Sequence, residues 1–193
     1  MSITGGIKLF DGNQRLFLTT GERHQFRKAT GSLETIEGLF CQFMYYTGCK
    51  LSEASEVYPD QIDHRGVQIR FHGNGQRRKA RAVPIPPLFC IEISIYLRVE
   101  LQNTSKPLWS ISRSAGWRLI KKVMKQASIT GKKATPTGLR HSFAISCLEM
   151  SSPIPLHWLQ EWMGHRRLDL TASYLNAIEY NEAENLKQLW NYY

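Results

Sequence analysis

The stretch that decides the fold of this chain is TGLRHSFA, residues 137–144. Pro136 stands just before it, and proline is favoured at the first position of a helix, so a helix is predicted over residues 137–150. An apolar segment with the sequence LQEWMGH follows at residues 159–165, and Tyr174 lies nine residues beyond His165. Arg140, His165 and Tyr174 therefore occur in that order around successive predicted helices.

These three residue types suit the metal-free cleavage of a phosphodiester. In that reaction a hydroxyl attacks in line, guanidinium and imidazole groups stabilise the charge on the phosphate oxygens, and an acid protonates the leaving oxygen. Tyr174 is the candidate nucleophile, Arg140 offers a planar fork to two phosphate oxygens, and His165 can donate to the same phosphate. Because an arginine is unfavourable at the positive end of a helix dipole, its place at a helix start also favours a bound anion.

Outward from this stretch the chain reads as one mainly helical α+β domain over residues 19–193, preceded by an irregular extension over residues 1–18. From residue 66 the apolar period changes to two, which predicts a strand near residues 67–71 and, after the turn Gly73-Asn74-Gly75, a return strand that Pro84 confines to a sheet edge. Ser32 is expected to cap the second helix, and Ser52 to begin the third. The other helices are expected at 19–31, 87–101, 112–127, 155–163, 168–176 and 179–191.

Composition favours an anionic polymer as the partner. Lys and Arg outnumber Asp and Glu by 25 to 16, and the formal net charge is +9. The chain contains no GxGxxG, GxxxxGK[ST] or HExxH motif, which leaves nucleotide and zinc-hydrolase functions without support. The four cysteines are scattered and are read as reduced thiols, so neither metal nor cofactor is expected. Because no signal peptide or membrane-spanning run is found, a cytoplasmic location is expected.

Two upstream elements complete a resemblance to the catalytic domain of the tyrosine recombinase, or phage integrase, family. Residues 46–53 (YTGCKLSE) are similar to the family's TG-x-R-x-S-E element, and residues 67–86 are similar to its basic β-hairpin ending in R-x-V-P. The family also shows the LRH-S/T-F-A helix start, the Gly-His helix end and the nucleophilic tyrosine. The resemblance covers about residues 19–180.

The resemblance implies site-specific DNA recombination (integration, excision, inversion or resolution) through a 3′-phosphotyrosyl intermediate and a free 5′-hydroxyl. It implies double-stranded DNA as the substrate, a dimer to tetramer on DNA, and a C-terminal helix that packs on a neighbouring subunit; accessory DNA-binding proteins are a further expected partner. Since the family's catalytic domain normally begins near the position of residue 19, we expect its N-terminal DNA-clamping domain to be absent.

Three positions depart from the family pattern. Lys50 replaces the first arginine, which keeps the positive charge but loses the bidentate fork. Thr137 replaces a histidine and can still donate a hydrogen bond, yet it cannot exchange a proton near neutral pH. Asn74 stands where the hairpin lysine is expected, and Lys79 or Arg77 of a longer turn is the replacement; Lys79 is the candidate acid for the leaving group.

The remaining site residues have two readings. The hairpin tip with Arg77, Arg78, Lys79 and Arg81 is either a DNA contact or a solvated turn. His141 is interpreted as a buried structural histidine that positions its neighbour. The departures also keep a second function open, in which a catalytically impaired relative uses the same scaffold to bind DNA and regulate; a type IB topoisomerase relative is a third reading.

Overall fold

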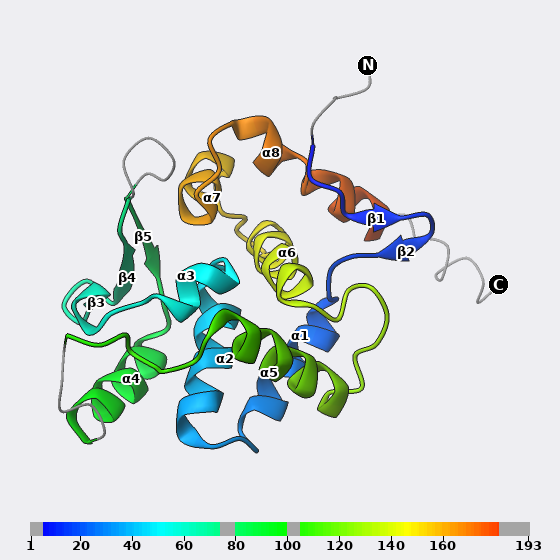
Figure 1. The fold of residues 1–193 in the computed structure, drawn as a ribbon. Coiled ribbons are helices and arrows are strands. Elements are labelled where there is room, and N and C mark those ends of the chain that lie inside the picture. The colour runs from blue at the N-terminus through cyan, green and yellow to red at the C-terminus, as the bar shows by residue number, and fades with distance from the viewer. Residues whose placement is uncertain (1–5, 74–79, 100–104, 182–193) are drawn as a thin grey trace.

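The computed structural model describes residues 6–73, 80–99 and 105–181, and it confirms a mainly helical α+β fold. The strands pair in two small antiparallel sheets, and helix α6 lies among the other helices (Figure 1). The helices are α1 (Thr20–Thr30), α2 (Thr35–Thr47), α3 (Leu51–Ser55), the 3₁₀ turn η1 (Pro59–Gln61), α4 (Pro87–Val99), α5 (Arg113–Gln126), α6 (Pro136–Leu148), α7 (Leu156–Met163) and α8 (Leu168–Ala172). The strands are β1 (Phe10–Asp11), β2 (Gln14–Arg15), β3 (Ile62–Asp63), β4 (Gln68–Phe71) and β5 (Arg81–Pro84).

Helix α6 is the centre of the fold. Only Thr137 and Ser146 of its residues are not buried, because α1, α2, α5 and α7 all pack against it. A helix surrounded on all sides shows no single apolar face. This burial carries Arg140 and His141 into the interior of the domain, so both need partners there.

The larger sheet has the order β3-β4-β5, with β5 at an edge as Pro84 predicted. It lies at one end of the domain, and α7 packs beside β5 (Figure 1). The turn between β4 and β5, which includes residues 74–79, lies outside the described residues. The sheet therefore brings Arg81, the first residue of β5, to the end of α7.

The N-terminal segment differs from the irregular extension that was expected. Residues Phe10–Asp11 and Gln14–Arg15 form a hairpin, and the following Phe17 and Leu18 are buried in the core. The backbone N–H of Leu18 donates to Ser142 Oγ of α6 at 2.7 Å. Strands of two residues are too short to show a period in the sequence, which is why the pattern did not reveal them.

Several helix boundaries differ from the predictions. Ser32 does not cap α2, because its hydroxyl donates to the carbonyl of Ala29 at the end of α1. Helix α3 begins at Leu51, and the Glu53 carboxylate accepts from the backbone N–H of Lys50, at 2.8 Å. Helix α8 ends at Ala172, before the predicted 176, and the next helical residues begin at 175, before the predicted 179. The remainder of that predicted helix, 182–193, lies outside the described residues, as do 100–104 after α4.

Two further features of the described ranges concern the chain's class. The four cysteines are buried free thiols. No helix in residues 6–73, 80–99 or 105–181 is long and apolar enough to cross a membrane.

Candidate active site

Arg140 is held between the C-terminal ends of two helices. Its Nη1 donates to the carbonyl oxygen of Gly48 at 2.7 Å, and its Nη2 donates to that of Met163 at 2.6 Å. Gly48 ends α2 and Gly164 ends α7, each with a left-handed φ that favours glycine; a Cβ at Gly48 would also collide with the Phe143 ring. The C-terminus of a helix carries partial negative charge, so this arrangement stabilises a guanidinium that is only 8% exposed.

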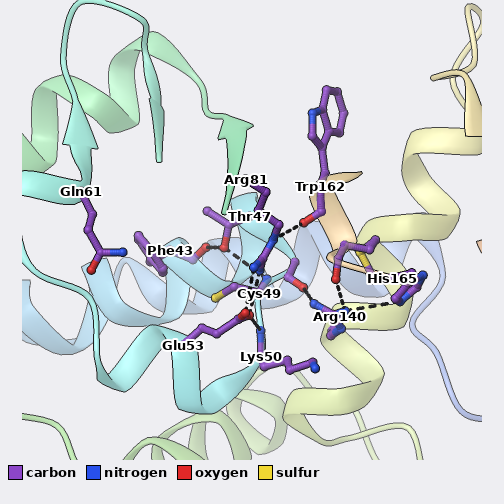
Figure 2. Close-up of polar contacts among 12 residues, drawn as sticks. Phe43, Thr47, Cys49, Lys50, Glu53, Gln61, Arg81, Arg140, Trp162 and His165 are labelled. Atoms are coloured by element: carbon purple, nitrogen blue, oxygen red, sulfur yellow. Dashed lines mark hydrogen bonds and ion pairs between the residues drawn. The ribbon is translucent and has the colours of Figure 1, made fainter. Parts of the chain in front are cut away.

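Arg81 is also buried, but it is paired with a carboxylate. Its Nη1 and Nη2 donate to the two oxygens of Glu53 at 2.9 and 2.8 Å, and its Nε donates to the Trp162 carbonyl at 2.9 Å (Figure 2). Burial alone would raise the pKa of Glu53, but the Arg81 ion pair outweighs it and lowers the pKa. The expectation that Arg81 contacts DNA is therefore wrong: it is 7% exposed and its fork is fully engaged inside the protein.

His165 lies next to Arg140 and is oriented by Thr171. Its Nδ1 is 3.0 Å from Thr171 Oγ1, and its Nε2 is 3.4 Å from Arg140 Nη2. Burial, with Arg140 and Lys50 nearby, lowers the pKa of His165 to about 4, so the ring is neutral at pH 7. When Thr171 donates to Nδ1, the proton of the neutral ring is on Nε2. His165 and Arg140 then present two donors to the same place, as an oxyanion requires.

Tyr174 lies behind this pair of donors. Its side chain is fully buried, and its ring stacks beside that of His165 with centroids 6.1 Å apart. Burial raises the pKa of the Tyr174 hydroxyl to about 12, while the positive charge of Arg140 acts in the opposite direction. The hydroxyl lies 3.0 Å from His141 Nδ1, so His141 contacts the candidate nucleophile itself.

A groove of about 1000 Å³ opens in front of Arg140. Lys50 and Thr137, predicted from the sequence, line it together with Arg140, at the start of α3 and of α6. In Figure 2, Lys50 lies beside Glu53, and Arg140 lies beside His165. Tyr174 and His165 are not among the lining residues. The structure thus places Lys50, Thr137 and Arg140 at the groove, whereas His165 and Tyr174 lie near Arg140 without lining it.

One wall of the groove was not predicted as part of the site. It is formed by α5, whose Arg113, Trp117 and Arg118 face the groove. Trp117 is 46% exposed, which is unusual for so large an apolar side chain. The available signal was the sequence RSAGWR, in which two arginines and a tryptophan share the exposed positions of an otherwise amphipathic helix.

Among the predicted residues of the hairpin tip, Arg81 lies in the described part of the chain. Asn74, Arg77, Arg78 and Lys79 lie outside the described residues, so their roles stay predictions. Within the described ranges no group of three or more His, Cys, Asp or Glu side chains is arranged to hold a metal ion.

Comparison with known proteins gives one family for most of the chain. The model of the phage integrase family matches residues 17–180. Tyrosine recombinase XerD of Bifidobacterium longum is 34% identical over 152 residues, which cover 70% of this chain and 48% of that protein. Tyrosine recombinase XerA of Pyrococcus furiosus is 31% identical over 158 residues, which cover 78% of this chain and 52% of that protein. The chain thus spans about half the length of these relatives.

Solved structures show the same fold. The XerH site-specific recombinase bound to palindromic difH substrate, in a post-cleavage complex, superposes with a TM-score of 0.72 at 19% identity over 96% of this chain and 56% of that chain. This likeness shows that the two proteins share a fold.

Proposed function

The chain belongs to the phage integrase family, and from this membership we propose that it is a site-specific recombinase that cuts and rejoins DNA strands through Tyr174. The observation that carries the proposal is the meeting of Arg140 and His165 beside the Tyr174 ring, with Arg140 also facing a groove. Its curated relatives are named tyrosine recombinases, which supports the same reaction.

In the proposed step the Tyr174 oxygen attacks a DNA phosphorus and the bond to the 5′-oxygen breaks. This leaves a 3′-phosphotyrosyl bond and a free 5′-hydroxyl. Arg140 would bind the non-bridging oxygens with the donors that its two carbonyl contacts leave over, and His165 would donate from Nε2. The phosphotyrosyl bond conserves the energy of the phosphodiester, so rejoining needs no cofactor.

Lys50 and Thr137 would perform the roles of the arginine and the histidine that they replace, but less effectively. The ammonium group of Lys50 neutralises charge at the groove without fixing the orientation of the phosphate. Thr137 is exposed at the same groove and can donate a hydrogen bond. Lys79 remains the proposed acid for the leaving 5′-oxygen.

The proposed substrate is double-stranded DNA. Arg113, Arg118 and Lys50 around the groove supply cations for phosphates, and the solved XerH structure holds its difH substrate. Exchange of strands between two duplexes needs more than one cutting subunit, so we propose that copies assemble on DNA, as a dimer or tetramer. Because its substrate is DNA, we also propose a cytoplasmic location.

The test uses a library of nicked DNA duplexes with a randomised central segment. Nicked substrates release a short strand after cleavage and trap the covalent intermediate. Protein–DNA adducts are recovered under denaturing conditions, and the attached DNA is sequenced. We expect wild-type protein to enrich one sequence as an adduct, and Tyr174→Phe to bind the same DNA without any adduct.

A specific complex without adduct in the wild-type protein would overturn the proposal. The scaffold would then be that of a DNA-binding regulator, the alternative that the altered Lys50 and Thr137 positions keep open. Restoring the family residues by Lys50→Arg with Thr137→His tests this reading directly, since a regulator would stay inactive.

A further inference from the structure

The Tyr174 hydroxyl and His141 form a buried contact that the proposed step does not yet use. Tyr174 Oη lies 3.0 Å from His141 Nδ1, with ring centroids 5.7 Å apart. His141 is 9% exposed and follows Arg140 directly on α6. We propose that His141 is the general base that takes the phenolic proton of Tyr174 as its oxygen attacks the phosphate, an inference that rests on the proposed function.

The nucleophile needs a base because the hydroxyl is protonated in the resting protein. Burial raises the pKa of Tyr174 to about 12, so almost no phenolate is present near neutral pH. Thr137, at the position where the family carries a histidine, has no group that accepts a proton at this pH. Another acceptor must therefore lie within hydrogen-bond distance of the hydroxyl, and His141 Nδ1 does.

The protonation state of His141 suits this role. Burial, and then the neighbouring Arg140, lower its pKa to about 4, so the ring is neutral and has one nitrogen free to accept. The charged and titratable groups that face it are Arg140 on its own helix, Tyr174 and, beyond Tyr174, His165. A DNA phosphate bound at Arg140 adds negative charge, which raises the pKa of His141 and favours proton uptake during attack.

His165 and His141 have different roles because they contact different groups. When Thr171 donates to His165 Nδ1, the proton on Nε2 lies beside Arg140, where it can be donated to a phosphate bound there. Within the described ranges, the hydrogen-bond partner of the Tyr174 hydroxyl is His141. His165 stabilises charge on the phosphate oxygens, and His141 serves the attacking oxygen.

The proton of Tyr174 Oη moves to His141 Nδ1 while the bond from Oη to phosphorus forms. The bond from phosphorus to the 5′-oxygen breaks, and that oxygen takes a proton from a separate acid. On rejoining, the 5′-hydroxyl returns its proton to that acid and attacks phosphorus, and the departing Tyr174 oxygen recovers its proton from His141.

The experiment compares single-turnover cleavage of the nicked DNA recovered with wild-type protein. His141→Gln keeps a polar side chain of similar size but cannot accept the proton, and we expect it to cleave about 100-fold more slowly with unchanged DNA binding. His24→Gln, a change at an exposed histidine of α1, is the matched control and should cleave at the wild-type rate. In His141→Gln the rate should rise in proportion to hydroxide concentration, because only solvent then removes the proton.

Two chemical substitutions, one in the protein and one in the DNA, separate a base from a structural role. Replacing Tyr174 by difluorotyrosine acidifies the nucleophile and should restore much of the lost rate in His141→Gln. A substrate with sulfur at the 5′-bridging position needs no acid for its leaving group, so it should not restore that rate. Failure of difluorotyrosine to help, or rescue by the sulfur substrate, would overturn the role of base.

His141→Phe gives an independent outcome. Loss of the base should slow cleavage, whereas an increase would show that the contact merely restrains Tyr174, which would overturn the proposal. Wild-type cleavage with equally fast His141→Gln would overturn this inference alone. A wild-type protein that binds its DNA and never forms an adduct would overturn the proposed function, and this inference with it.

Discussion

Arg81 and Arg140 are two buried arginines that contact the same helix end but differ in their charged partners. Both donate to a carbonyl in the last turn of α7, Arg81 to Trp162 and Arg140 to Met163. Arg81 is neutralised by the Glu53 carboxylate, whereas Arg140 forms no ion pair within the described part of the chain. A buried guanidinium whose charge is not compensated by a carboxylate can bind an anion from outside the protein. A guanidinium that is paired with a buried carboxylate holds the fold together.

The largest expected effect comes from breaking the neutralised pair. Arg81→Met leaves the Glu53 carboxylate buried without its partner, and removal of one member of a buried pair costs roughly 3–5 kcal/mol. We expect the free energy of unfolding, measured in denaturant, to fall by about this amount. The double variant Arg81→Met with Glu53→Leu should recover much of the loss, because it buries no charge. If the double variant were as unstable as the single one, the pair would not be the cause.

Arg140→Met should reduce the rate of cleavage strongly and the stability less than Arg81→Met does. Loss of a donor to the transition state costs roughly 2.7–4 kcal/mol, so cleavage of the recovered nicked DNA should slow by two to three powers of ten. The unfolding free energy should change less than in Arg81→Met, since no carboxylate is left unpaired. A variant that unfolds as easily as Arg81→Met but still cleaves would reverse the comparison.

As pH falls, the histidines near Arg140 should lose their contribution to stability before Glu53 does. His141 has a pKa of about 4 when folded and 6.5 when unfolded, so between these values the unfolded chain binds more protons and stability falls as pH falls. The loss for His141 is roughly 2–3 kcal/mol between pH 6.5 and 4. His165 acts in the same direction. The Glu53 contribution is lost only below about pH 4.5, since its pKa is lowered. Unfolding measured from pH 7 to 4 checks this, and His141→Gln should flatten the upper part of the curve.

The smallest expected effect is at Lys50. Lys50→Arg restores the planar fork at the groove and should speed cleavage by about tenfold or less, which is ~1.4 kcal/mol in the barrier at most. Lys50→Ala should slow cleavage further because the positive charge is lost. Both variants should change the free energy of unfolding less than Arg81→Met does, because Lys50 is exposed at the groove. Equal rates for all three proteins would remove Lys50 from the reaction.

The same two arginines show how far the sequence predicts the site. Arg140 was identified because its neighbours form a motif, and the helix that carries it was predicted with its Pro136 start. Arg81 was assigned to DNA because it stands in a basic run, and nothing in that run shows that Glu53, 28 residues upstream, receives it. Composition predicts that cations are present, but only the packing of β5 against α7 decides which of them face inward.

Features that are very short, or that depend on residues far apart in the chain, could not be predicted from the sequence. The β1 and β2 strands have two residues each, and Trp117 on α5 resembles an ordinary core residue until its exposed position is known. The sequence indicates a structural role for His141, and no local signal in it reveals the contact with Tyr174, which lies 33 residues away. A helix with a long periodic pattern, such as α5, is predicted closely from the sequence, since its signal lies within the helix itself.

The two carbonyl contacts of Arg140 have a consequence for synthesis of the protein. The guanidinium binds one carbonyl 92 residues upstream and another 23 residues downstream in the chain. A nascent chain that has passed residue 140 but not residue 163 therefore has the arginine without half of its support. The support of Arg140 is complete only after residue 163 has been made, so a polypeptide that ends between residues 140 and 163 lacks the Met163 carbonyl and leaves this arginine with the Gly48 contact.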